Sequence, residues 1–220
     1  MKRIGLVHAV APAIAPIHTA FAREWPQARL QNVHDDGLTT ALQEEGAITT
    51  RIHERILRLA QVASDGADAV LFTCTAFDAA IDAARACLGV PVLKPNEAMY
   101  EAGLARGERV GLLATFEPAV STMEQALIAT AGARGMQVSV RSVYVAHALD
   151  AARQGDVARH NALVASAARA LAGCDVLLLG QFSTSTALQA TQQAVAQPVL
   201  SAPEAAVLRL KRSFGVTENQ

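Results

Sequence analysis

The sequence predicts an α/β protein made of two pseudo-symmetric, Rossmann-like (flavodoxin-like) halves with mainly parallel sheets. Short apolar runs alternate with segments of helical periodicity along all 220 residues, as in parallel strands joined by crossover helices. Hydrophobic residues make up 51% of the chain, enough for a core on both faces of a sheet. Aromatic residues make up only 4%, so Ala, Val, Leu and Ile must fill that core. An internal repeat, described below, predicts the division into halves.

The expected strands are short apolar runs, and the segments between them have helical spacing. The longest of these is expected as one helix from Thr40 to Ala63, with an inner face formed by Ile52, Ile56, Leu57, Leu59 and Ala60. Asn96 is expected to cap the helix that follows it. The expected strands are Arg3–His8, Ala28–Val33, Ala69–Thr73, Pro91–Lys94, Arg109–Ala114, Gln137–Val145, Asp175–Gly180 and Pro198–Ser201.

The repeat links the two parts of the chain in order. Residues 66–98, shifted by 107 positions, fall on residues 173–205 without a gap, and a shift of 106 aligns "RIGLVHAVAP" with "RVGLLATFEP". Two blocks in the same order with nearly the same offset favour duplicated αβ halves. We expect residues 1–97 with 203–220 to form the first half and residues 98–202 the second. The matched pairs include Gly66 with Gly173, Asp68 with Asp175, Leu71 with Leu178, and Pro91 with Pro198.

Polar residues follow the strands that the repeat pairs, and ligands of open α/β sheets bind beyond the carboxyl ends of strands. The site is therefore expected where the strand ends of the two halves meet. Cys74 stands between a strand and a helix, where the helix N-terminus is expected to lower its pKa. A buried structural cysteine is the alternative. His8 could act as a second acid or base, or be a hydrogen-bonded loop histidine.

The segments "TCTA", "GLLAT" and "LLLGQFS", in this order, resemble the aspartate/glutamate (hydantoin) racemase superfamily, which includes arylmalonate decarboxylase and maleate isomerase. The resemblance implies a cofactor-independent enzyme, a homodimer or higher homo-oligomer, acting on a small carboxylate. In the racemases, two cysteines on opposite faces of the substrate exchange a proton. Cys74 matches the first of these, with Thr73 and Thr75 as flanking donors. Thr115 matches a threonine that binds the substrate carboxylate.

The sequence departs from the racemase pattern at two positions. Gln181 stands where the second cysteine belongs, and His8 replaces an Asp-Ser pair. An amide does not exchange protons at useful pKa values, but it can hold a carboxylate or an oxyanion, as can His8 and the nearby Ser183. One-thiol chemistry by Cys74 is therefore expected.

The predicted function is proton transfer at a carbon alpha to a carboxylate, so the enzyme is expected to be an isomerase of the racemase or epimerase type. Two alternatives keep the single cysteine: a decarboxylase, which is a lyase, and a cis–trans isomerase of a small dicarboxylate. A binding protein without catalysis, which kept the cleft after losing one cysteine, is a further alternative.

Composition and missing motifs exclude other classes of protein. The net charge is −1 without a basic run, and no apolar stretch reaches a membrane span, so neither nucleic acid nor a membrane is an expected partner. Three cysteines, an odd number, indicate a reducing compartment, and we expect a cytoplasmic protein. The chain contains no G-x-G-x-x-G after its first strand, no phosphate-binding loop motif and no H-x-x-x-H. No cofactor and no metal are expected.

Overall fold

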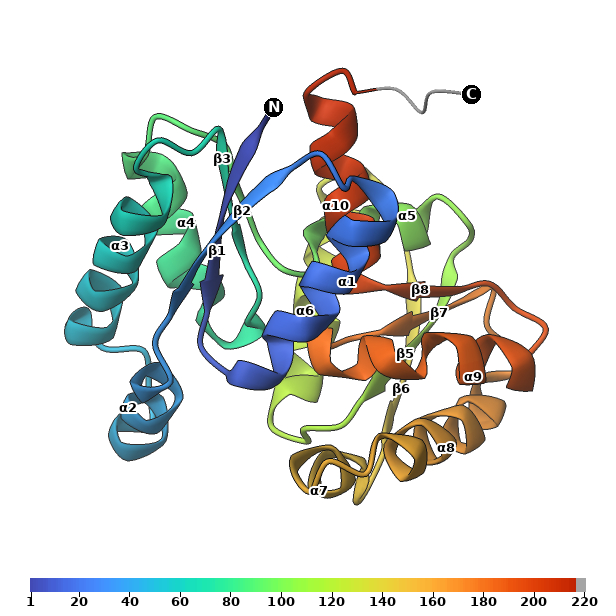
Figure 1. Ribbon diagram of the computed structural model, residues 1–220. Helices are drawn as coiled ribbons and strands as arrows, with labels where there is room; N and C mark the ends of the chain where they lie inside the picture. Colours follow the sequence, from blue (N-terminus) through green and yellow to red (C-terminus); the bar gives the residue numbers. More distant parts are fainter. Residues whose placement is uncertain (217–220) are drawn as a thin grey trace. The chain divides into compact units, whose positions relative to one another are not determined.

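The computed structural model describes residues 1–216 and contains two four-stranded sheets whose neighbouring strands all run parallel (Figure 1). The strand orders are β2-β1-β3-β4 and β6-β5-β7-β8, so both sheets have the same topology. This confirms the predicted fold of two parallel α/β halves. The strands are β1 (Arg3–His8), β2 (Arg29–His34), β3 (Ala69–Phe72), β4 (Val92–Leu93), β5 (Arg109–Ala114), β6 (Ser139–Tyr144), β7 (Val176–Leu179) and β8 (Val199–Ser201).

The chain divides into two compact units, each with one sheet. Unit 1 holds Met1–Pro95 and the part of the chain from Ala206 onwards, and unit 2 holds Asn96–Ala205. Eight of the helices are α1 (Ile14–Glu24), α4 (Asp78–Cys87), α5 (Glu97–Leu104), α6 (Ala119–Gly132), α7 (Ala148–Arg153), α8 (Val157–Ala168), α9 (Leu188–Ala194) and α10 (Ala202–Ser213). Short 3-10 turns are η1 (Ala11–Ala13), η2 (Thr75–Phe77), η3 (Arg169–Leu171) and η4 (Phe182–Ala187).

The single helix predicted from Thr40 to Ala63 is wrong, because the chain forms two helices there. These are α2 (Gly37–Glu45) and α3 (Thr50–Ser64). Gly46 ends α2 in the left-handed conformation with φ of 68°, which glycine adopts without a steric penalty. Thr49 then begins α3 by accepting a hydrogen bond at Oγ1 from the Ile52 backbone N–H. Helical periodicity continued through both helices and hid the break.

Helix α3 packs on the first sheet with most of the predicted inner face, while Leu57 and Leu59, also predicted there, lie at its edge and are only partly buried. Ile52, Ile56 and Ala60 are buried in one apolar cluster with Val70 and Phe72. Within unit 1, α3 and α4 lie on one side of the sheet and α1 lies on the other (Figure 1). Both faces are therefore covered, and for this reason β3 is buried at every residue.

The aspartates matched by the repeat have the same structural role in both sheets. Asp68 accepts a hydrogen bond at Oδ2 from the Arg3 backbone N–H, at 2.8 Å, where β1 begins. Asp175 accepts the equivalent bond from the Arg109 backbone N–H, at 2.9 Å, where β5 begins. Each carboxylate thus satisfies a donor at the start of a central strand. The repeat therefore reports a duplicated local structure as well as a similar composition.

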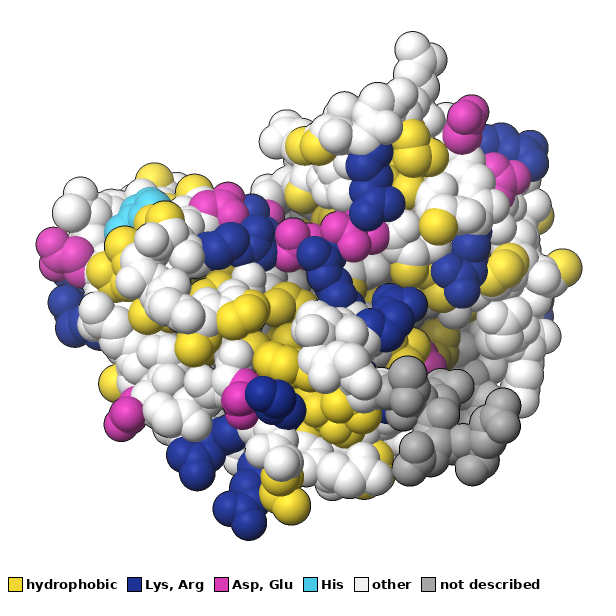
Figure 2. All heavy atoms as spheres, turned by 90° about the horizontal axis from the view of Figure 1, so that it is seen from above, with side chains coloured by type: hydrophobic (Ala, Val, Ile, Leu, Met, Phe, Trp, Pro, Cys, Tyr) yellow, Lys and Arg dark blue, Asp and Glu magenta, His cyan; other side chains and the backbone are white. Residues whose placement is uncertain are grey.

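The surface agrees with the near-neutral composition. On the face in Figure 2, acidic and basic side chains are mixed over the surface. Among residues 1–216, no helix is both long enough and apolar enough to cross a bilayer.

Candidate active site

In unit 1, the carboxyl ends of β1 and β3 bring His8 and Thr73 together. His8 is the last residue of β1, and Thr73 follows β3, which pairs with β1. The Thr73 backbone N–H donates to the Val7 carbonyl at 3.0 Å and continues the pairing. His8 Nδ1 lies 2.9 Å from Thr73 Oγ1, and both side chains are buried. The neighbouring Cys74 is thus preceded by a hydroxyl that a histidine holds in place.

Two further polar residues, which local sequence does not single out, extend this cluster. Asn32 Oδ1 lies 2.9 Å from His8 Nε2 and also 2.9 Å from His18 Nε2. Asn32 belongs to β2, an edge strand, where a polar residue is ordinarily read as solvent-facing. The strand register could have indicated the role of Asn32. His34 pairs with His8, and Asn32, two positions before His34, lies on the same face of the sheet, because side chains alternate between the faces.

The environment of Cys74 differs from the expected one. Cys74 is partly exposed and has an extended backbone before η2, while α4 begins only at Asp78. Burial raises the pKa of the Cys74 thiol above its usual value, a hydrogen bond with the Ala76 backbone opposes the rise, and the Asp78 carboxylate adds to it. The prediction that a helix N-terminus lowers this pKa is therefore wrong. Three residues separate the thiol from the helix, and its contact with the apolar core dominates.

In unit 2, Thr115 and Gln181 form the corresponding strand-end cluster. Gln181 Oε1 accepts a hydrogen bond from the Thr115 backbone N–H at 2.7 Å and another from Thr115 Oγ1 at 2.9 Å. A backbone N–H can only donate, so the amide oxygen must face Thr115 and the amide NH₂ must point away from it. Within the described part of the chain, that NH₂ has no hydrogen-bond partner. It can therefore donate to an anion.

Asn96 supports the same strand end, although the sequence suggested only a helix cap. It stands at the N-cap position of α5, but its side chain makes no capping bond. Its Nδ2 donates instead to the carbonyl of Gly180, at 2.7 Å, and to the hydroxyl of Tyr100. Asn96 is 3% exposed, and this contact holds the backbone immediately before Gln181.

The remaining predicted residues lie in the turns after the same strands. Thr75 begins η2 and Ser183 lies in η4; both are partly buried. Their hydroxyls make no hydrogen bond within residues 1–216. The structure therefore joins His8 to Thr73 in unit 1 and Thr115 to Gln181 in unit 2, and it leaves Thr75 and Ser183 available to a ligand.

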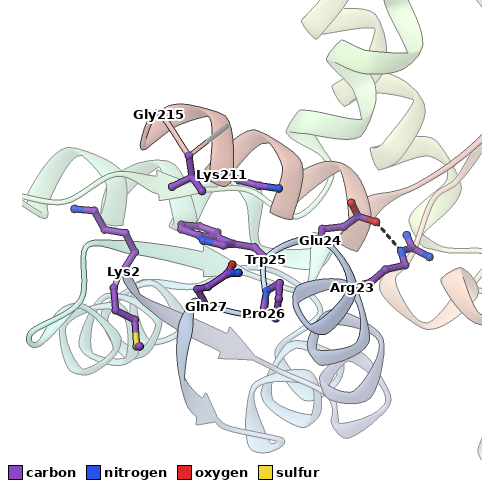
Figure 3. Close-up of a pocket in the computed structure, with 10 residues that line it drawn as sticks. Lys2, Arg23, Glu24, Trp25, Pro26, Gln27, Lys211 and Gly215 are labelled. Atoms are coloured by element: carbon purple, nitrogen blue, oxygen red, sulfur yellow. Dashed lines mark hydrogen bonds and ion pairs between the residues drawn. The ribbon is translucent and has the colours of Figure 1, made fainter. Parts of the chain in front are cut away.

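A pocket of about 880 Å³ lies elsewhere in unit 1, near the amino ends of β1 and β2 (Figure 3). Its lining includes Lys2, Trp25 and Lys211, which come from three distant parts of the sequence. None of the predicted site residues lines it, because those residues follow the carboxyl ends of strands. Nowhere in residues 1–216 do three or more His, Cys, Asp or Glu side chains form a group that could hold a metal ion.

The fold and the two strand-end clusters define a class of protein: a duplicated, parallel α/β protein with polar residues after equivalent strands. The family model of Asp/Glu/hydantoin racemases matches residues 34–210. The chain belongs to this family. None of the curated protein sequences matches it significantly.

Solved structures with the same fold are similar over nearly the whole chain. A glutamate racemase isoform from Bacillus anthracis is 18% identical with a TM-score of 0.69, and the match covers 100% of this chain and 85% of that one. Allantoin racemase from Pseudomonas fluorescens is 16% identical with a TM-score of 0.70, covering 99% and 94%. A glycine-to-cysteine mutant of arylmalonate decarboxylase is 22% identical with a TM-score of 0.66, covering 99% and 95%. At these identities the likeness shows the fold.

Proposed function

We propose that this protein is a cofactor-independent enzyme that transfers a proton at a carbon alpha to the carboxylate of a small acid or amino-acid derivative, with Cys74 as its single catalytic thiol. Racemisation or epimerisation is the reaction that the family membership favours. The Cys74 thiolate would remove the alpha proton, and a water molecule would return a proton on the opposite face, because the Gln181 amide is not an acid. The observation that carries the proposal is the contrast at equivalent strand ends: a thiol after β3, and after β7 a glutamine whose free NH₂ can donate to an anion.

The substrate carboxylate would be held by hydrogen-bond donors that follow the carboxyl ends of strands. We propose Thr75, Gln181 and Ser183 as the direct donors. Thr115 gives both its N–H and its O–H to Gln181, and so directs the Gln181 NH₂ group. His8, whose ring nitrogens contact Thr73 and Asn32, acts through Thr73, which donates when His8 is protonated. Hydrogen-bond donors directed at the carboxylate stabilise the enediolate that forms when the alpha carbon becomes a carbanion. A neutral amide at residue 181 suits this task, because it stabilises negative charge without competing for the proton.

Decarboxylation is a second candidate, and the raised pKa of Cys74 favours it. In this reaction the bond between the alpha carbon and one carboxylate breaks, carbon dioxide leaves, and the electron pair remains in the enediolate. The Cys74 S–H then donates its proton to the alpha carbon, and solvent reprotonates the resulting thiolate. Such a reaction begins with a neutral thiol, whereas racemisation begins with a thiolate that removes a proton.

The experiment is incubation of the protein in heavy water with single enantiomers of aspartate, glutamate and allantoin, and with phenylmalonate. Deuterium uptake with loss of optical rotation supports racemisation, and release of carbon dioxide supports decarboxylation. Cys74→Ala should abolish either reaction, and the matched control Cys87→Ala, which changes an exposed cysteine, should not. Turnover that persists in Cys74→Ala contradicts the proposal. Tight binding of an acid without turnover identifies a binding protein instead.

A cis–trans isomerase of a dicarboxylate is tested in the same way with maleate, by following the appearance of fumarate. We further propose a cytoplasmic location and a homodimer or higher homo-oligomer. Fractionation and light scattering test these two points.

A further inference from the structure

A chain of hydrogen-bonded side chains leads from His18 through Asn32 and His8 to Thr73, next to Cys74. Asn32 Oδ1 is 2.9 Å from Nε2 of both histidines. A carbonyl oxygen only accepts, so each imidazole donates an N–H from Nε2 to it, and the neutral form of His8 carries its proton on Nε2. His8 Nδ1 is then an acceptor, and the Thr73 hydroxyl donates to it across 2.9 Å. Asn32 thus selects the tautomer of His8, and His8 selects the direction of the Thr73 hydroxyl.

Protonation of His8 reverses that direction. The Thr73 hydroxyl has one proton, and neutral His8 uses it. When Nδ1 of His8 gains a proton, it donates to Thr73 Oγ1, and the hydroxyl proton must turn elsewhere. The Val7 carbonyl lies 3.3 Å from Thr73 Oγ1, which is a weak acceptor position, so a carboxylate beside Cys74 would compete well for the proton.

We propose that His18, Asn32 and His8 are positioning residues that set the direction of the Thr73 hydroxyl. While His8 is neutral, the Thr73 hydroxyl gives its proton to His8 and can only accept from a ligand. When His8 is protonated, the Thr73 hydroxyl can donate to a carboxylate. This inference rests on the proposed function, because it assumes that a carboxylate binds next to Cys74.

Several groups determine when His8 takes up its proton. Burial lowers its pKa, the hydrogen bond to Asn32 raises it, and the charges of His34 from β2 and His18 from α1 lower it. After β3, Cys74 adds no charge at neutral pH, because its own pKa is raised. Free His8 is therefore neutral at pH 7. A carboxylate at Thr73 favours the protonated form, so binding becomes stronger as the pH falls through the pKa of free His8.

Two reagents test this direction on the reaction of Cys74 itself. Iodoacetate and iodoacetamide react in the same way: the thiolate sulfur bonds to the methylene carbon, and iodide leaves. Only iodoacetate carries a carboxylate. The ratio of their rates at Cys74, followed by peptide-resolved mass spectrometry, cancels the thiolate fraction. We expect this ratio to rise by about tenfold as the pH falls through the pKa of His8, the size of one charge-assisted hydrogen bond.

Variants separate the hydroxyl from the charge of His8. Thr73→Val keeps the charge and removes the hydroxyl, so the rise in the ratio should disappear, whereas Thr73→Ser should retain it and shows that the site tolerates substitution. The matched control is His34→Asn, which changes the register partner of His8 outside the hydrogen-bonded chain. This variant should retain the full size of the rise but move it to higher pH, because the charge of His34 no longer lowers the pKa of His8.

The ¹⁵N chemical shifts of the His8 ring report its tautomer and its pKa in the protein without ligand, and so test the hydrogen bonds among His18, Asn32 and His8. Asn32→Asp should raise the pKa of His8 and move the rise in the ratio to higher pH, because a carboxylate stabilises the imidazolium. Asn32→Ala should lower the pKa of His8 and allow the neutral ring to carry its proton on either nitrogen. A His8 ring unchanged by Asn32→Ala overturns the proposal, and so does a pH-dependent ratio that survives Thr73→Val. Failure of both reagents to modify Cys74 even at alkaline pH would instead contradict the proposed function.

Discussion

Two substitutions at Gln181 separate its structural role from its proposed role in binding. Gln181 Oε1 receives two hydrogen bonds from Thr115, which is 2% exposed. Gln181→Leu removes the acceptor and leaves a buried backbone N–H without a partner, which costs about 1–3 kcal/mol of the free energy of unfolding. Gln181→Glu retains an acceptor for both donors, so its unfolding free energy should stay within about 1 kcal/mol of wild type.

The same pair should behave in the opposite order in function. Glutamate lacks the NH₂ group and adds a negative charge where the proposal places the substrate carboxylate. Loss of a hydrogen bond to a charged group, about 1.5–3 kcal/mol, corresponds to a decrease in kcat/KM of about 10- to 150-fold. Guanidinium unfolding measures the first effect, and the rate of alpha-deuteration measures the second. Wild-type kcat/KM in Gln181→Glu, or wild-type stability in Gln181→Leu, would refute the reasoning.

Three further predictions concern Cys74 and the frame of the sheets. Since burial raises the pKa of Cys74, its alkylation by iodoacetamide should accelerate only at a pH above the range in which a model cysteine peptide ionises; a pH profile equal to that of the peptide contradicts this. Gly5→Ala would place Cβ 2.0 Å from the Ala63 backbone carbonyl oxygen, so unfolding experiments should show a loss of about 1–3 kcal/mol, whereas Gly89→Ala, with no atom within 4 Å, should stay within about 0.5 kcal/mol. The hydrogen bonds from Arg109 lower the pKa of Asp175, so the stability that the Asp175 carboxylate contributes is present above its unfolded pKa and is lost as the pH falls through its folded pKa. Asp175→Asn should therefore flatten the dependence of the unfolding midpoint on pH in the acid range. An unchanged slope would contradict the role given to Asp175.

The strands were the part of the fold that could be predicted most closely. Arg3–His8 and Arg109–Ala114 have the predicted bounds, and every other strand begins and ends within two residues of its predicted limits. Buried parallel strands are continuous apolar runs, which local sequence displays directly. The break between α2 and α3 was missed because hydrophobic periodicity continues across Gly46, whose positive φ depends on the path of the chain.

For the candidate site, too, local properties could be predicted from the sequence and non-local properties could not. Position after a strand is a local property, and it selected Cys74, Thr73, Thr115 and Gln181. The sign of the pKa shift at Cys74 depends on the apolar residues packed against the thiol, and these come from other parts of unit 1. A helix N-terminus was expected to dominate, but desolvation has the larger effect.

The sequence by itself determined the class of this protein: two parallel α/β halves, matched by a repeat at offsets of 106 and 107, with a thiol and a glutamine after equivalent strands. These features follow from hydrophobic patterning and from the order of residues along the chain. Only the tertiary structure decided that Asn32 and His18 stand behind His8, that Asn96 holds the Gly180 carbonyl, and that the Gln181 amide directs its oxygen to Thr115. The physical reason is that a side-chain hydrogen bond requires two groups within about 3 Å, and residues far apart in sequence reach that distance only when strands pair in register.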